Sequence, residues 1–259
     1  MPIAHSNQTS IFYTTDGDPA LPALILSNSL GTDYTMWQAQ ADALSPYFQV
    51  IRYDTRGHGR SGCPPGPYRM AQLGADVIAV LDALGIARAH FCGISMGGMI
   101  AQWMGLHASG RIDKLVIANS AAKIGSSEGW LARAAAVRAD GLDAIADGAG
   151  ARWFTPAFIA RQPGQVASLA AGLRAGNAEG YASCCEALAE ADYRDHIHAI
   201  PNATLIIAGR DDPVTTEADA QFLQQGIAGA QMAVLPASHI SNIEAEAAFT
   251  QTLADFLRA

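Results

Sequence analysis

The sequence is poor in positive charge. Lys114 and Lys123 are its only lysines, and 16 lysines and arginines together face 24 aspartates and glutamates, which gives a formal net charge of −8. Binding to a phosphate backbone or to an anionic lipid surface requires clustered positive charge. We therefore expect neither nucleic acid nor a membrane as a partner.

Segments that would direct the chain into or across a membrane are also missing from the sequence. No apolar run approaches the roughly 20 residues that a bilayer-spanning helix needs. Residues 1–7 have neither the basic region nor the apolar region of a signal peptide. These features predict a cytoplasmic protein.

Cysteine is scarce, and the four cysteines are badly placed for a metal. Cys63, Cys92, Cys184 and Cys185 do not follow the spacing of a metal site. The last two are adjacent, and neighbours on a helix point about 100° apart, which makes them poor ligands of one ion. We expect reduced thiols in the core and no bound metal.

The 259 residues have the composition of a globular protein, since half are hydrophobic and 15% are charged. Short β-rich runs alternate with helical patterns, of which the clearest covers residues 70–84. Such alternation predicts a mostly parallel sheet with helices on both faces, an α/β fold. The expected strands are 11–15, 23–28, 50–54, 90–93, 114–119, 203–209 and 232–235.

The strand runs disappear between about residues 121 and 192. Helical patches cover residues 130–138, 165–173 and 180–189 of this segment, and a closing helix is expected over 243–257. Helices inserted between two sheet-forming parts predict a lid above the carboxyl edge of the sheet. We therefore divide the chain into a core of residues 1–120 and 193–259 and a helical lid of residues 121–192.

The strongest local signal for chemistry is the G-x-S-x-G pattern of residues 93–97. Ser95 stands between a strand run and a helical pattern, the context in which this pattern forms a sharp turn called the nucleophile elbow. Glycines are needed there because side chains would collide with neighbouring backbone. The serine is left at the N-terminus of a helix, where negative charge is favoured. Ser95 is the candidate nucleophile, and an ordinary turn is the alternative.

A serine hydroxyl needs a base that an acid holds in place, and at such an elbow both follow the serine in the chain. His239 has the expected position, in a loop between the last strand run and the closing helix. His196 and His198, near the end of the lid, stay open as alternatives. The remaining histidines have other expected roles: His5 at a terminus that frays, His58 in shaping a loop, His90 at the start of a strand and His107 at a helix end.

Two aspartates follow the strand run 203–209, and either could reach His239. Asp212 is favoured because its G-x-x-D spacing from Gly209 matches the loop that carries the acid in proteins with a nucleophile elbow. Asp211 is then interpreted as a turn residue that binds its own backbone.

An oxyanion hole needs two backbone N–H groups aimed at the developing negative charge. The amide of Met96, directly after the nucleophile, is expected to be one of them. The second should come from the loop after strand 23–28. Aligned on the usual His-Gly-x pattern, Asn28 and Ser29 take the places of His and Gly, and Leu30 becomes the donor.

Several longer motifs are typical of a single family rather than of all proteins with a nucleophile elbow. The chain carries SNSLGT (27–32), RYDTRGHGRS (52–61), SMGGMI (95–100) and NSAAKIG (119–125). It also carries EGW (128–130), RWFTP (152–156), YASCC (181–185) and SHISNIE (238–244). Together these segments resemble the 3-oxoadipate enol-lactone hydrolases, or β-ketoadipate enol-lactonases, of the α/β-hydrolase superfamily. The 27–32 loop and the lid segments are the specific part, because many relatives share the others.

The resemblance implies the α/β-hydrolase fold, a doubly wound, mostly parallel sheet with a helical lid inserted after the sixth strand. It also implies a bacterial enzyme of aromatic degradation that opens a small anionic enol-lactone, which bears an acetate arm, to 3-oxoadipate. Ser95 would be the nucleophile, His239 the base and Asp212 the orienting acid, with no metal or organic cofactor. In the lid, Arg133 is a candidate donor to the acetate and Trp130 a candidate pocket wall, although surface exposure and lid packing would also explain them.

Two other functions stay open. A general carboxylesterase or perhydrolase-like enzyme would share the elbow but would not prefer an acidic lactone over neutral esters. A receptor on the same scaffold would keep the three residues and bind a ligand without turnover. A haloalkane dehalogenase is disfavoured because its nucleophile is a carboxylate, whereas residue 95 is serine. The sequence does not determine the oligomeric state.

Replacing Asp212 with asparagine should lower turnover by orders of magnitude, because the base loses the charged acceptor that orients it. Asp211→Asn should change turnover little, because its side chain is assigned to the turn. Steady-state kinetics of the two variants test the assignment, and the reverse ranking would contradict it.

Overall fold

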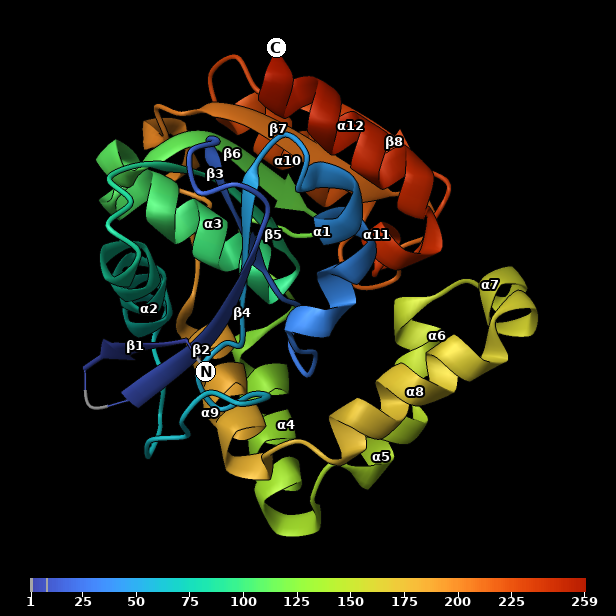
Figure 1. Ribbon diagram of the computed structural model, residues 1–259. Coiled ribbons are helices and arrows are strands. Elements are labelled where there is room, and N and C mark those ends of the chain that lie inside the picture. Colours follow the sequence, from blue (N-terminus) through green and yellow to red (C-terminus); the bar gives the residue numbers. More distant parts are fainter. Residues whose placement is uncertain (1, 8) are drawn as a thin grey trace.

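The computed structural model describes residues 2–7 and 9–259, and these form one sheet with helices on both sides and a separate group of helices (Figure 1). The strand order is β1-β2-β4-β3-β5-β6-β7-β8. Neighbouring strands from β4 to β8 are parallel, whereas β1 and β2 form an antiparallel edge. The strands are β1 (Ile3–Ser6), β2 (Thr9–Asp16), β3 (Ala23–Ser27), β4 (Gln49–Tyr53), β5 (Ala89–Ile94), β6 (Ile112–Ala118), β7 (Ala203–Gly209) and β8 (Gln231–Leu235).

The central strands are apolar because the sheet is covered on both faces. Every residue of β3, β4 and β5 is buried, as expected for parallel strands between two helical layers. Helices α2 (Met70–Ala83) and α3 (Met96–His107) pack together on one side, and α1 (Gln38–Leu44) and α12 (Glu246–Arg258) on the other (Figure 1). The predicted mostly parallel, doubly wound sheet is therefore confirmed. Helices α10 (Glu217–Gly226) and α11 (Ser241–Glu244) follow β7 and β8.

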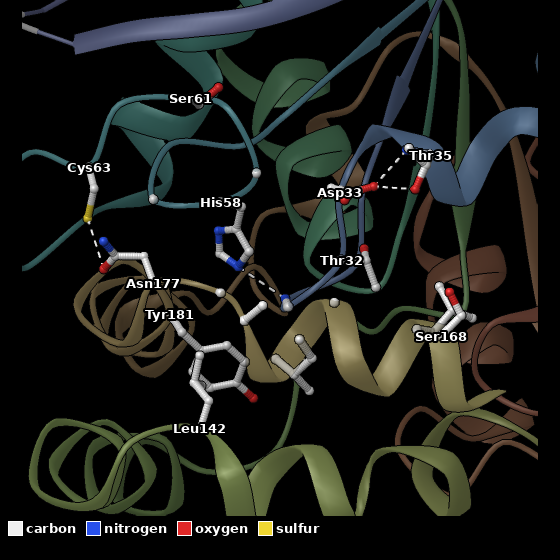
Figure 2. Close-up of a pocket in the computed structure, with 18 residues that line it drawn as sticks. Thr32, Asp33, Thr35, His58, Ser61, Cys63, Leu142, Ser168, Asn177 and Tyr181 are labelled. Carbon is white, nitrogen blue, oxygen red and sulfur yellow. Dashed lines mark hydrogen bonds between the residues drawn. The ribbon is translucent and has the colours of Figure 1, made fainter. Parts of the chain in front are cut away.

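Six helices lie between β6 and β7, within the segment expected to form a lid. Of these, α4 (Ser127–Asp140) and α9 (Ala178–Glu190) pack against each other, and the rest form an arm beside the core (Figure 1). The helices of the arm are α5 (Asp143–Asp147), α6 (Ala149–Trp153), α7 (Pro156–Arg161) and α8 (Pro163–Arg174). A cavity of about 520 Å³ lies between α8 and the core loops 31–35 and 57–63 (Figure 2). The division at residues 120 and 193 stays a prediction.

Two sequence expectations about secondary structure are wrong. The terminus that was expected to fray contains strand β1, which includes His5. The buried positions of this strand are Ala4 and Ser6, so its sequence lacks the alternation of large apolar and polar residues that predicts a strand. The closing helix is divided into α11 and α12 because Ala245 leaves the helical conformation at φ −113° and ψ 44°. Apolar periodicity does not detect a break of one residue. Each of the seven expected strands matches one of β2 to β8, with ends that differ by at most two residues.

A buried ion pair fixes the loop after β4, which lies near the carboxyl edge of the sheet. Arg56 Nε and Nη2 each lie 2.6 Å from a carboxylate oxygen of Asp76 on α2, and both side chains are 1% exposed. A bidentate guanidinium–carboxylate pair restricts both the position and the orientation of the two groups. The loop is thereby tied to the helical layer beneath it.

Removing the acid of this pair should destabilise the protein strongly. Asp76→Ala should lower the free energy of unfolding by about 3–5 kcal/mol, because it leaves a buried, uncompensated guanidinium. Asp113→Ala breaks a half-exposed pair with Arg88 and should lower it by only about 0–1 kcal/mol. Denaturant unfolding of both variants tests this difference, and equal losses would contradict it.

Candidate active site

Ser95 lies in the turn between β5 and α3, where its backbone has φ 59° and ψ −116°. A positive φ is strained for a residue with a side chain, and close packing maintains it. A β-carbon at Gly93 would lie 2.0 Å from the Gly97 carbonyl oxygen, and one at Gly97 would lie 2.3 Å from the Ser27 carbonyl oxygen. The turn leaves Ser95 at the carboxyl edge of the sheet and at the N-terminus of α3, where the helix dipole favours negative charge.

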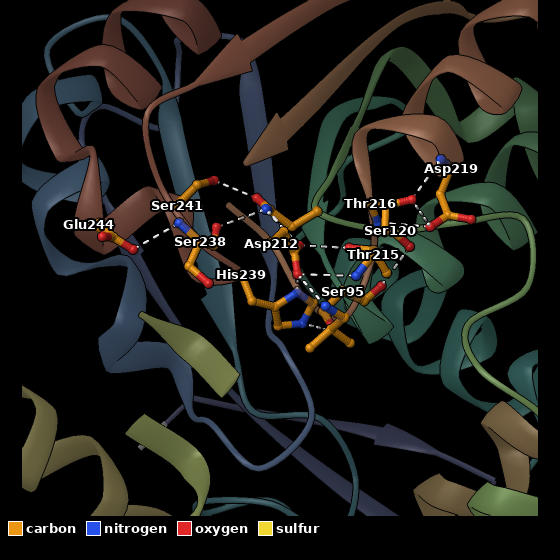
Figure 3. A network of polar contacts seen from close by, with 12 residues as sticks. Ser95, Ser120, Asp212, Thr215, Thr216, Asp219, Ser238, His239, Ser241 and Glu244 are labelled. Carbon is orange, nitrogen blue, oxygen red and sulfur yellow. Dashed lines mark hydrogen bonds and ion pairs between the residues drawn. The ribbon is translucent and has the colours of Figure 1, made fainter. Parts of the chain in front are cut away.

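A chain of hydrogen bonds connects Ser95 with His239 and Asp212 (Figure 3). His239 Nε2 lies 2.8 Å from Ser95 Oγ, and His239 Nδ1 lies 2.8 Å from Asp212 Oδ2. Exposed fractions are 6% for Ser95, 3% for His239 and 6% for Asp212. Because an ionised carboxylate only accepts hydrogen bonds, the proton belongs on Nδ1, and Nε2 is left to accept from the serine hydroxyl. This arrangement can remove the serine proton as the oxygen attacks an acyl carbon.

Asp212 is buried but has enough donors to stay ionised. Burial raises the pKa of its carboxyl, but the hydrogen bonds from His239, Asn119 and the Thr215 amide outweigh burial, so the pKa lies below its ordinary value. Oδ2 also accepts from Thr215 Oγ1 at 2.8 Å, and Oδ1 accepts from the Val214 amide at 2.7 Å. The carboxylate is therefore fixed in position from several sides.

Asp211, the alternative acid, points elsewhere. It is exposed, and its amide donates to the Ala237 carbonyl oxygen at 3.0 Å. Its side chain makes no hydrogen bond in the described part of the chain, so the expectation of an aspartate that binds its own backbone is not met. The pair His239–Asp212 is the one that the fold brings together.

Asn119 is a buried polar residue of the site to which the sequence analysis gave no role. Its Nδ2 donates to Asp212 Oδ2 at 3.0 Å and to the Ser238 carbonyl oxygen at 3.1 Å, and its Oδ1 accepts from Ser241 Oγ at 2.5 Å. The residue is 1% exposed and has φ 42°. It joins the loop of the acid to the loop of the base. The sequence feature that could have identified Asn119 is its position, since it is a polar residue directly after the buried strand β6.

The two expected oxyanion donors lie on loops that are bonded to each other. The Gly97 amide donates to the Asn28 carbonyl oxygen at 3.1 Å, which joins the elbow to loop 27–32. Asn28 is itself fixed, since its Nδ2 donates to the Tyr53 carbonyl oxygen and its Oδ1 accepts from Trp37 Nε1. Within the described residues, neither the Leu30 amide nor the Met96 amide donates to another protein group.

A cavity of about 230 Å³ opens in front of Ser95 and His239. Its walls come from both the core and the lid, and Leu30 and the lid residues Trp130 and Arg133 are among them. Trp130 is anchored by a hydrogen bond of 2.6 Å from its Nε1 to the Ile124 carbonyl oxygen. The remaining lining residues are Ser29, Ile124, Gly125, Ser126, Gly129, Arg152, Trp153, Leu173, Tyr181 and Val214.

Two arginines line this cavity, and the sequence analysis gave a role to only one of them. Arg133 lies over the Trp130 ring, 4.7 Å from its centroid. Arg152 on α6 donates to the Ile145 carbonyl oxygen, and burial and the neighbouring charge of Arg133 act to lower its pKa. Neither guanidinium forms an ion pair with a residue of the described ranges. The site can therefore attract an anion.

The carboxylate of Glu244 connects the loop that contains His239 to the lid. Glu244 accepts a hydrogen bond from the Ser238 amide at 2.9 Å (Figure 3). It also accepts one from Thr155 Oγ1 at the start of α7. The Ile240 amide also donates to the Trp153 carbonyl oxygen at 3.0 Å. The position of His239 is thus linked to the helices that form the outer wall of the cavity.

The other candidate groups lie away from Ser95. His5, His107, His196 and His198 are exposed, and none of these histidines lines the cavity in front of Ser95. Cys92, Cys184 and Cys185 are buried free thiols, whereas Cys63 is exposed, which corrects the expectation of four core thiols. In residues 2–7 and 9–259, no group of histidine, cysteine and acidic side chains is arranged to hold a metal. Every helix in these ranges is too short or too polar to cross a bilayer.

Comparison with known proteins agrees with this architecture. Residues 22–246 match the family model described as alpha/beta hydrolase fold, so the chain belongs to the α/β-hydrolase family. Within that family it is 51% identical to 3-oxoadipate enol-lactonase 2 of Acinetobacter baylyi, over 98% of this chain and 97% of the relative. It is 45% identical to 3-oxoadipate enol-lactonase 1 of the same organism, over 94% of this chain and 91% of the relative.

A solved structure gives the same result. The enol-lactonase from Burkholderia xenovorans LB400 superposes with a TM-score of 0.98 at 45% identity, and the match covers 100% of both chains. The resemblance inferred from the motifs, including those of the lid, is therefore confirmed.

Proposed function

We propose that this protein is a serine hydrolase that opens 3-oxoadipate enol-lactone to 3-oxoadipate. The observation that carries the proposal is the hydrogen-bonded chain Ser95–His239–Asp212 at a cavity lined by two arginines that have no acidic partner among residues 2–7 and 9–259. Relatives named 3-oxoadipate enol-lactonases, similar over nearly the full length, support the substrate. A small lactone with one carboxylate suits a cavity of about 230 Å³ with positive charge.

In the first half-reaction, Ser95 Oγ attacks the lactone carbonyl carbon while His239 Nε2 takes the serine proton. The carbonyl oxygen becomes an oxyanion, which the Leu30 and Met96 amides stabilise. Asp212 keeps the His239 proton on Nδ1 and stabilises the imidazolium that forms. The ring C–O bond then breaks, and His239 returns the proton to the departing enol oxygen. The enol stays attached through its carbon chain, because the acyl group and the leaving group belong to one molecule.

In the second half-reaction, His239 takes a proton from water as the water oxygen attacks the acyl-enzyme. The bond to Ser95 Oγ breaks, the serine recovers its proton from His239, and a second carboxylate is released. The enol rearranges to the ketone, which makes ring opening effectively irreversible. None of these steps requires a metal or an organic cofactor.

The substrate test is ring opening of the enol-lactone generated in situ, followed as loss of its ultraviolet absorbance. Wild type should turn the lactone over many times, and Ser95→Ala should lose that activity because it lacks the nucleophile. Hydrolysis of aryl esters without lactone turnover would indicate the general esterase instead. A single reaction of Ser95 with an organophosphonate, without turnover of either substrate, would indicate a receptor.

The two arginines should bind the acetate arm rather than take part in bond making. Arg133→Ala should raise KM for the lactone roughly tenfold to hundredfold, the effect expected when a hydrogen bond to a charged group is lost, with little change for a neutral aryl ester. Arg152→Ala should act in the same direction. Arg161→Ala, an exposed arginine of α7 outside this cavity, is the matched control. Equal effects on both substrates would contradict the assignment.

A further inference from the structure

Loop 27–32 contains no histidine, but an imidazole reaches it from another part of the chain. The Gly31 amide donates a hydrogen bond to His58 Nε2 at 3.0 Å (Figure 2). His58 lies in the loop that follows β4 and is 7% exposed. It borders the larger cavity and does not line the one that contains Ser95. His58 therefore contacts the loop of a proposed oxyanion donor without facing the substrate cavity.

The direction of this bond requires a neutral ring with a defined tautomer. An amide N–H can only donate, so His58 Nε2 must present its lone pair to Gly31. Nδ1 then carries the proton, and it lies 3.3 Å from the Arg56 carbonyl oxygen, which can accept it. Burial lowers the pKa of His58, which favours the neutral ring.

The hydrogen bond between Gly31 and His58 means that Leu30 is held on both sides. The Ser29 carbonyl and the Leu30 N–H belong to one planar peptide and point in opposite directions. The Ser29 carbonyl oxygen accepts from the Thr32 amide at 3.2 Å and from Thr32 Oγ1 at 2.8 Å, which fixes that peptide. The next peptide carries the Gly31 N–H, and His58 fixes it. Both peptides that flank the Leu30 α-carbon are thus held.

Both partners of the bond are held by packing. Gly31 has φ 81°, and a β-carbon there would lie 2.6 Å from Leu173 Cδ1 in the lid. The loop of His58 contacts the lid at Gly57, where a β-carbon would lie 2.5 Å from the Gly180 α-carbon. Without His58, the Gly31 amide would lose its partner in a crowded position, and the loop would shift to find another.

We propose that His58 is a positioning residue for the oxyanion hole, acting through its hydrogen bond to Gly31 on the orientation of the Leu30 amide. The inference rests on the proposed roles of Ser95 and Leu30, and it holds for any acyl substrate of this site. His58 itself touches neither substrate nor the reacting atoms.

The test compares His58→Leu, which removes the acceptor, with His58→Gln, whose side-chain carbonyl oxygen can accept from Gly31. His58→Leu should lower kcat about tenfold to hundredfold with KM nearly unchanged, somewhat less than the ~10²–10³ expected when a donor is lost completely. His58→Gln should recover most of this loss. His90→Leu is the matched control, because His90 is also buried but packs against Phe48 away from the site.

Phenylboronic acid separates positioning of the oxyanion hole from a general structural defect. It bonds to Ser95 Oγ and gives a tetrahedral, negatively charged adduct, so its Ki should rise in His58→Leu by the same factor by which kcat falls. An unchanged Ki, an effect confined to KM, or equal losses in the Leu and Gln variants would overturn the proposal.

Two measurements keep the proposal testable if a variant is unstable or the substrate is misassigned. In wild-type protein labelled with 15N-histidine, the His58 ring should show the Nδ1–H tautomer at pH 7, and an Nε2–H tautomer would overturn the proposal without any variant. All kinetics are repeated with p-nitrophenyl acetate. Failure of wild type on the enol-lactone alone would remove the proposed substrate, whereas an intact kcat of His58→Leu on the aryl ester would remove the role of His58.

Discussion

The Gly97 amide donates to the Asn28 carbonyl oxygen at 3.1 Å, and this contact exists only because residue 97 has no side chain to separate the two segments. It joins the elbow, which follows β5, to the loop that follows β3. The two strands are neighbours in the sheet, so both segments begin at the same edge. The two amides proposed to stabilise the oxyanion, Leu30 and Met96, therefore have a fixed separation before any substrate arrives. Preorganised donors of this kind are effective because they do not have to reorient during the reaction.

A second set of contacts arranges the base and the acid around the elbow. Strands β6, β7 and β8 run parallel and end at the same edge, and Asn119, Asp212 and His239 come from the segments that follow them. Asn119 bonds to the acid and to the backbone before the base, so one buried amide couples two loops. Glu244 then connects the base loop with the lid. The order of the strands brings these residues together, and hydrogen bonds set their final geometry.

The proposed preference for an anionic lactone rests on residues of the lid. The elbow and its partners would serve many esters, whereas the two guanidiniums and the Trp130 ring come from helices α4 and α6. The sequence indicated Trp130 through a lid motif, and Arg133 because it follows Trp130 and could pair with the acetate arm, but Arg152 was given no role. It begins the RWFTP motif, but that motif was used only for the family resemblance, and its short helix carries no periodic pattern that would give the arginine a role. Its position beside Arg133 follows from the way α4 and α6 pack.

Strands β2 to β8, the elbow at Ser95 and the choice of His239 could be predicted before the fold was known. They depend on apolar runs, on glycines in a tight turn and on the order of residues along the chain. The sequence also favoured Asp212 over Asp211 from the spacing after β7. Packing between distant segments sets which groups lie opposite each of these residues. The contacts of Asn119 with Asp212, of His58 with Gly31 and of Arg152 with the cavity all join segments far apart in the chain, and such partners depend on how sheet, loops and lid pack together. Local sequence patterns do not encode that packing, which is why the candidate nucleophile could be predicted from the sequence and the residues that support it could not.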